Sequence, residues 1–141
     1  MRGRVANWKC RRVERWKFRG KMAIGLHKDL RIWGESVKLI KKVYAIADKM
    51  PSSEEYNLKQ QIKRAVVSVS LNIAEGRNRK TRKEFLNFMN ISYASLCEVD
   101  AILDICKDLG YIGNDEEVKL EIQSLGKMMN ALRSKLYRDE K

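Results

Sequence analysis

Residues 82–109 read RKEFLNFMNISYASLCEVDAILDICKDL, and this stretch is the longest helical pattern in the chain. Its apolar or small positions recur in alternating steps of four and three residues, which is the spacing of one face of an α-helix. These positions are Phe85, Met89, Ser92, Leu96, Val99, Leu103 and Cys106. A second apolar set widens the face: Phe88, Ile91, Ile102, Ile105 and Leu109. We therefore expect this helix to contact neighbours on two sides.

Both ends of this helix carry recognisable signals. Thr81-Arg82-Lys83-Glu84 has the spacing of a capping box. In such a box the hydroxyl of the first residue accepts from the amide of the fourth, and the carboxylate of the fourth accepts from the amide of the first. Gly110 follows the last apolar residue, where a left-handed C-terminal cap needs glycine. The sequence thus predicts a helix of about residues 82–109 with defined ends.

A second helix is predicted upstream, from about Asp29 to Lys49. Its expected apolar stripe is Leu30, Trp33, Val37, Ile40, Tyr44 and Ala47. Met50-Pro51 ends it, because the residue before proline is displaced from helical geometry.

Two more amphipathic segments complete the pattern. One begins at a capping box, Ser52-Ser53-Glu54-Glu55, and ends near Gly76. Its apolar positions are Leu58, Ile62, Ala65, Val66, Val69 and Ile73. The last follows a looser cap at Asn114–Glu117, and its apolar positions are Val118, Ile122, Leu125, Met129, Leu132 and Leu136. Four helices with short connections predict an all-α fold, an antiparallel up-down-up-down four-helix bundle.

Composition limits the class of protein. The 141 residues include 30 Lys and Arg against 18 Asp and Glu, for a net charge of +12. No 18-residue apolar window and no apolar stretch after the first charges exist, so we expect no membrane span and no secretory signal. Cys10, Cys97 and Cys106 are odd in number and suit reduced thiols, which favours a cytoplasmic location.

The charge is concentrated at the N-terminus. Residues 1–21 hold nine basic side chains and one acid, interleaved with Trp8, Trp16 and Phe18. Such a segment can bind RNA through phosphates and stacked bases. Alternatively Met22 begins a shorter chain, and the extension has no selected role. We expect residues 1–26 to be a basic, disordered extension and residues 27–141 to be the bundle domain.

Little in the sequence supports catalysis. His27 is the single histidine, so the Glu-x-x-His pairs of di-iron bundles are absent, and no Cys-x-x-Cys or phosphate-binding glycine loop occurs. We expect no enzymatic activity, no metal and no cofactor. Asn72 and Glu75 interrupt an apolar helix end, and we expect them to bond across to a neighbouring helix and fix register. Catalysis by Glu75 is the alternative.

A cationic cluster follows that helix. Arg77, Arg79, Lys80, Arg82 and Lys83 lie within seven residues, at a turn and beside a helix N-terminus. Such a cluster is either a solvated charge run or a phosphate-binding site. Lys63 and Arg64, with Lys59, are further candidates for phosphate contact.

Several motifs resemble one protein family. They are Leu30-Arg31-Ile32-Trp33, Met50-Pro51, Glu54-Glu55-Tyr56-Asn57-Leu58, Gln61-Ile62-Lys63-Arg64-Ala65, Asn72-Ile73-Ala74-Glu75-Gly76, Phe85-Leu86, Ser95-Leu96-Cys97-Glu98 and Leu109-Gly110-Tyr111-Ile112. Over roughly residues 27–137 the chain resembles the four-helix bundle family encoded in 23S rRNA intervening sequences of bacteria. The resemblance implies a homo-oligomeric ring, a pentamer, without implying an activity. The family usually has Pro where Ser70 stands and Gly where Ala94 stands. Ser70 should make its helix straighter there, and Ala94 adds a methyl group where two helices are expected to approach closely.

We therefore expect a non-enzymatic, oligomeric basic bundle that binds nucleic acid, rRNA or another structured RNA, through phosphates. The alternative is an accessory module that docks a protein partner such as a reverse transcriptase.

Overall fold

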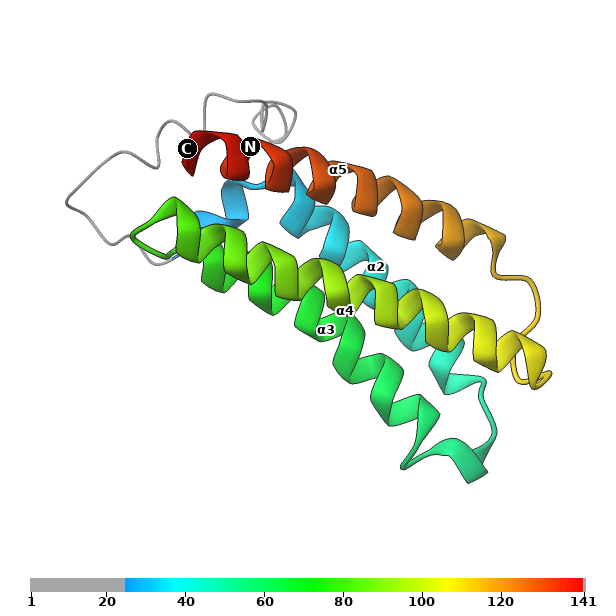
Figure 1. The fold of residues 1–141 in the computed structure, drawn as a ribbon. Helices are drawn as coiled ribbons and strands as arrows, with labels where there is room; N and C mark the ends of the chain where they lie inside the picture. The colour runs from blue at the N-terminus through cyan, green and yellow to red at the C-terminus, as the bar shows by residue number, and fades with distance from the viewer. Residues whose placement is uncertain (1–24, 141) are drawn as a thin grey trace.

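The computed structural model describes residues 25–140, and this part of the chain is entirely helical and contains no strand. Its elements are the 3-10 turn η2 (Leu26–Asp29), helix α2 (Arg31–Asp48), the 3-10 turn η3 (Ser52–Glu54), and helices α3 (Leu58–Arg77), α4 (Arg82–Asp108) and α5 (Glu116–Glu140) (Figure 1). The prediction of an all-α fold with four long helices is confirmed. The basic segment 1–21 lies outside the described residues, and the predicted domain boundary after residue 26 stays a prediction.

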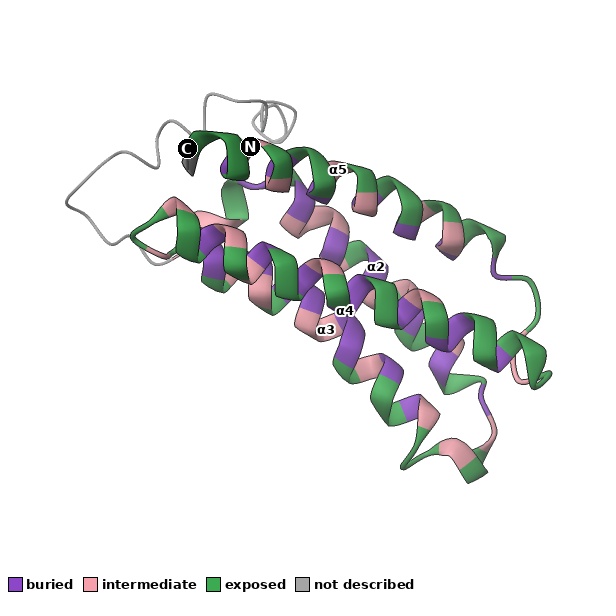
Figure 2. Cartoon of the chain, viewed as in Figure 1, coloured by how far each residue is buried: buried purple, intermediate pink, exposed green. Residues whose placement is uncertain are grey.

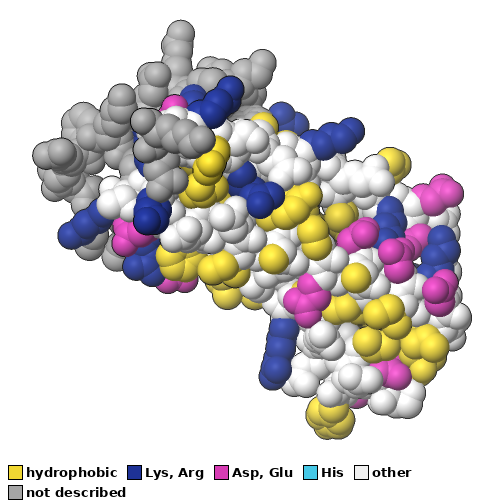
Figure 3. Space-filling view, in the orientation of Figure 1, with side chains coloured by type: hydrophobic (Ala, Val, Ile, Leu, Met, Phe, Trp, Pro, Cys, Tyr) yellow, Lys and Arg dark blue, Asp and Glu magenta, His cyan; other side chains and the backbone are white. Residues whose placement is uncertain are grey.

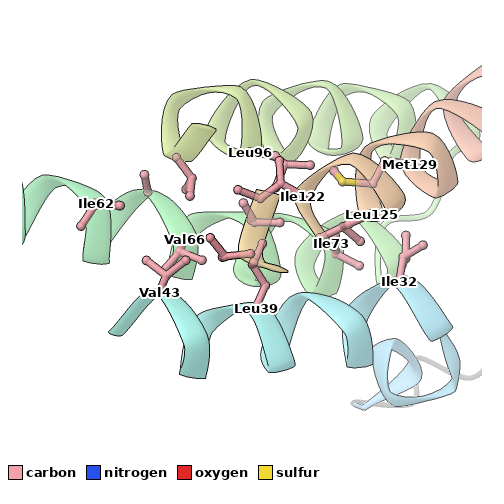
Figure 4. Packing of buried hydrophobic residues seen from close by; sticks show 14 of the residues in the cluster. Ile32, Leu39, Val43, Ile62, Val66, Ile73, Leu96, Ile122, Leu125 and Met129 are labelled. Atoms are coloured by element: carbon pink, nitrogen blue, oxygen red, sulfur yellow. The ribbon is translucent and has the colours of Figure 1, made fainter. Parts of the chain in front are cut away.

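The four helices enclose one hydrophobic core. Each helix packs against the next in sequence, and α2 also contacts α5. The connection between α3 and α4 lies at the same end as η2 and the last turn of α5, whereas η3 and the α4–α5 connection lie at the other end (Figure 1). Buried residues line the inward sides of all four helices (Figure 2). Ile32, Leu39, Val66, Leu96 and Met129 meet in this core (Figure 4).

The predicted apolar stripe of α2 is only partly right, because the fully buried face lies beside it. Its buried residues are Ile32, Ser36, Leu39, Val43 and Ala47. Of the predicted set, Leu30 and Ala47 are buried, and Trp33 and Ile40 are partly buried against the core. Val37 is half-buried and Tyr44 is exposed. Helix α2 carries two neighbouring apolar stripes. The fully buried one contains a serine, so the periodicity favoured the other.

A set of serines connects α2, α3 and α4. The Ser36 and Ser70 hydroxyls lie 2.7 Å apart in the core, and Ser36 Oγ also donates to the Trp33 carbonyl. The Ser68 and Ser95 hydroxyls lie 2.9 Å apart, and Ser92 Oγ donates to the Val69 carbonyl at 2.7 Å. These bonds satisfy polar groups whose burial would otherwise cost about 1–3 kcal/mol each.

All but one of the predicted helix-end signals are found, since α2 ends at Asp48, before Met50-Pro51, and Asn114 Oδ1 accepts from the Glu116 amide at the start of α5. The capping box of Thr81 and Glu84 is present, and Gly110 has a φ of 75°. The capping box predicted at Ser52 is wrong, because those residues form η3 and α3 begins at Leu58. Glu54 Oε2 instead accepts from the Leu58 amide at 3.3 Å.

Candidate nucleic-acid interface

The five cations of the predicted phosphate site lie where α3 ends and α4 begins. We call Arg77, Arg79, Lys80, Arg82 and Lys83 the basic corner. Gly76 lets the two helices approach here, because a Cβ on Gly76 would lie 2.7 Å from Phe88 Cβ. The sequence signal for this contact was the glycine itself, in the Asn-Ile-Ala-Glu-Gly run.

The corner arginines on α3 are held by the protein. Arg77 is buried, with 5% of its surface exposed. Arg79 forms an ion pair with Glu75, one turn earlier, and its guanidinium carbon lies 4.6 Å from the Phe88 ring centroid. These two side chains therefore stabilise the α3–α4 junction and present little free charge.

The remaining cations of the corner differ in their freedom. Arg82 Nη1 lies 3.1 Å from Asp139 Oδ2, which ties the start of α4 to the end of α5. Lys80 and Lys83 are exposed, and within residues 25–140 neither has a hydrogen bond or ion pair. Two lysines are thus the corner's accessible charges.

The α4 N-terminus is already capped. The Glu84 amide donates to Thr81 Oγ1 at 3.1 Å, and the Thr81 amide donates to Glu84 Oε2 at 3.2 Å. A carboxylate therefore sits where the helix dipole would attract a phosphate. The charge of Lys80 and Lys83, rather than the helix end, is what this corner offers an anion.

Lys59, Lys63 and Arg64 do not join the corner. Arg64 precedes Arg77 by thirteen residues of α3, which is about 20 Å at 1.5 Å per residue. Lys59 pairs with Glu55 at 2.6 Å. Lys63 pairs with Asp48 at 2.7 Å, a bond that raises the pKa of Lys63 and lowers the pKa of Asp48. Arg64 is exposed.

One cation near the corner, Arg138, was not among the residues predicted to bind phosphate. Arg138 lies in the last turn of α5, and the Arg82–Asp139 ion pair brings that turn to the start of α4. Arg138 is exposed and forms no ion pair or side-chain hydrogen bond with the described residues. Nothing local in the sequence links Arg138 to residue 80; the link is tertiary.

The predicted register role of Asn72 and Glu75 is wrong. Asn72 Nδ2 donates to the carbonyl and hydroxyl of Ser68 in its own helix, and Glu75 pairs with Arg79 in the same helix. The serines make the interhelical bonds instead.

The described residues also bear on other kinds of site. Burial and the neighbouring Lys28 charge lower the pKa of His27, whose ring lies edge-on to Trp33 at 4.7 Å. Within residues 25–140 no three His, Cys, Asp or Glu side chains are placed to hold a metal ion. In that same part of the chain, every helix is too short or too polar to cross a bilayer.

The fold and the surface charge together define the class of protein: it is a four-helix protein with exposed cations at one end of its helices. Comparison with protein families then matches residues 28–131 to the family described as 23S rRNA-intervening sequence protein. The match covers most of the chain, and the chain belongs to this family. No curated protein matches the chain.

Proposed function

We propose that this chain is a non-enzymatic, homo-oligomeric RNA-binding protein that holds phosphates at the basic corner. The observation that carries the proposal is the clustering of three exposed cations: Lys80 in the α3–α4 connection, Lys83 in the first turn of α4 and Arg138 in the last turn of α5. Phosphate contacts of this kind supply affinity without base-specific recognition. The family's link to an rRNA gene region supports RNA, rRNA or another structured RNA, as the ligand.

Self-assembly is the second part of the proposal. An up-down-up-down path places the corner at one end of each subunit. A closed ring, a pentamer, would bring every corner to the same side. Each subunit's modest charge would then add to one continuous basic surface for a polyanion. The proposed ring is cytoplasmic.

The test compares two triple variants of equal net charge. In the corner variant Lys80, Lys83 and Arg138 become Gln; in the control variant Lys41, Lys49 and Lys127, which are exposed elsewhere, become Gln. We expect only the corner variant to lose most of its affinity for a structured rRNA fragment. Its plot of log affinity against log salt should flatten by about 0.7–0.9 for each lost phosphate contact.

Equal slopes for the two triple variants would refute the corner as the RNA site. A wild-type protein that shifts no RNA at 100 mM salt would refute RNA binding altogether. In that case the alternative function, docking of a protein such as a reverse transcriptase, would be tested with the purified candidate partner.

A further inference from the structure

A surface groove runs along the outward side of α3. It has a volume of about 670 Å³ and is bordered by Tyr44 of α2 and by Tyr56 before α3. Val67 and Leu71 line it as well, and Leu71 is 61% exposed. Exposed apolar side chains that lie in a groove with a polar rim are typical of an interaction site.

Within the described residues, all but one of the charged side chains lining this groove are neutralised inside the subunit. Lys59 pairs with Glu55, Lys63 with Asp48, and Glu75 with Arg79. The exception is Arg64, which lies near the middle of α3 and has no ion pair among the described residues. The groove thus combines exposed apolar side chains with neutral or paired polar groups and has one available positive charge near its centre.

A complementary strip lies on the outward side of α4. We call it the α4 ridge, and it consists of Ile91, Ala94, Glu98, Ala101 and Ile105, all exposed and spaced by three or four residues. Apolar side chains appear at several points of the face along which α4 runs (Figure 3). Ala94 does not lie between helices of the subunit, contrary to the expectation from the family pattern; its small side chain instead lets another helix approach the ridge.

The ridge has one negative charge at its centre. Glu98 Oε1 accepts from Gln61 Nε2 at 3.1 Å and, among the described residues, forms no ion pair. The groove and the ridge therefore match: each carries exposed apolar side chains, and their central charges have opposite sign.

We infer that the α4 ridge of one copy seats in the α3 groove of a second copy, with Arg64 against Glu98. This inference rests on the self-assembly part of the proposed function. Leu71 lies seven residues from Arg64, and Ile91 and Ile105 each lie seven residues from Glu98. Leu71 therefore meets an isoleucine whichever way the partner helix runs. Val67 likewise meets one of the two alanines.

The pairing uses two different surface patches, one beside α2 and one on α4. Such a contact is head-to-tail, and repeated head-to-tail contacts close into a ring or extend as a chain. The inference also gives Arg64 a role other than the predicted one: Arg64 binds a neighbouring subunit and not RNA.

The test is a charge exchange between separate chains. Arg64→Glu and Glu98→Arg are each expected to raise the protein concentration at which the assembly dissociates by at least tenfold, as measured by light scattering and sedimentation. Mixing the two variants should raise the mass again, because every interface between unlike copies joins opposite charges. A five-membered ring of the mixture keeps one like-charged interface, so the double variant Arg64→Glu/Glu98→Arg, in which every interface joins opposite charges, should restore assembly in full. Lys80→Glu makes the same charge change outside the groove and should leave the mass unchanged. Circular dichroism confirms that each variant is folded.

Each other outcome overturns the inference. It fails if the wild-type protein is a monomer throughout the measured concentrations, if Lys80→Glu dissociates it as Arg64→Glu does, or if the mixture stays dissociated. The RNA-binding proposal fails separately, through the corner variant's salt slope. An assembly rescued by mixing that binds no RNA would retain the interface and remove the RNA function. If Arg64→Glu keeps the mass of the assembly and wild-type RNA binding is normal, the inferred interface is refuted and the RNA function is retained.

Discussion

Gly76→Ala tests whether close helix contact holds the basic corner together. Gly76 lies in the last turn of α3 and is buried against α4. A methyl group there would lie 2.7 Å from Phe88 Cβ, 3.1 Å from Phe85 Cδ1 and 3.4 Å from the Phe85 carbonyl oxygen. The first contact is with an atom next to the α4 backbone, so the helices themselves must separate to relieve it.

Two opposing terms set the size of the effect. Overpacking a tight contact costs typically about 1–3 kcal/mol. Replacing glycine by alanine inside a helix raises the free energy of unfolding by roughly 0.5–1 kcal/mol. We therefore expect Gly76→Ala to lower the free energy of unfolding by about 1–2 kcal/mol. For a domain of this size the melting temperature would fall by roughly 4 °C per kcal/mol.

Gly126 provides the matched control. A methyl group on Gly126, in the middle of α5, would lie 3.7 Å from Leu96 Cδ2 and 3.8 Å from Tyr93 Cε2, which is ordinary van der Waals contact. Gly126→Ala should therefore raise the stability by roughly 0.5–1 kcal/mol. Urea unfolding followed by circular dichroism, at one fixed protein concentration because assembly also stabilises the fold, measures both variants. A Gly76→Ala protein as stable as wild type, or a shift of the same sign in both, would refute the reasoning.

Two further predictions concern buried polar groups. Burial should hold the pKa of His27 below 6.5, so the folded state favours the neutral ring. The free energy of unfolding should therefore fall as the pH drops below 6.5. NMR titration of this single histidine measures the pKa, and a value at or above 6.5 contradicts the prediction. Ser36→Ala removes the partner of the buried Ser70 hydroxyl and should cost about 1–3 kcal/mol, whereas adding Ser70→Ala should cost little more. Denaturant unfolding of the two single variants and the double variant measures the coupling, and full additivity would show that the two hydroxyls do not interact.

The helices were predictable because their cores are periodic. Phe85, Met89, Leu96 and Val99 of α4 are buried as their spacing predicted. The choice between the two stripes of α2 was not predictable, since Ser36 becomes an inward residue only when Ser70 of α3 gives its hydroxyl a partner. Periodicity detects apolar side chains and cannot detect a hydrogen bond between helices.

The sequence predicted that the cations of the candidate site cluster, but it could not predict which of them are paired and which are free. The run from Arg77 to Lys83 indicates basic charge at one turn. Which of its cations are free depends on Phe88, Glu75 and Asp139, and Asp139 is 56 residues away from Lys83. Arg138 lies near the corner for the same reason, because the Arg82–Asp139 ion pair brings the end of α5 to the start of α4.

The two proposals place assembly and RNA binding on different parts of the same two helices. The inferred interface uses the middle of α3 and α4, around Arg64 and Glu98, whereas the corner lies where these helices meet, about 20 Å along α3. A neighbour seated in the α3 groove therefore leaves Lys80 and Lys83 accessible. Because copies in a ring are related by rotation alone, every corner lies at the same level along the ring axis. Assembly would then raise affinity for a long polyanion and leave affinity for a short one nearly unchanged.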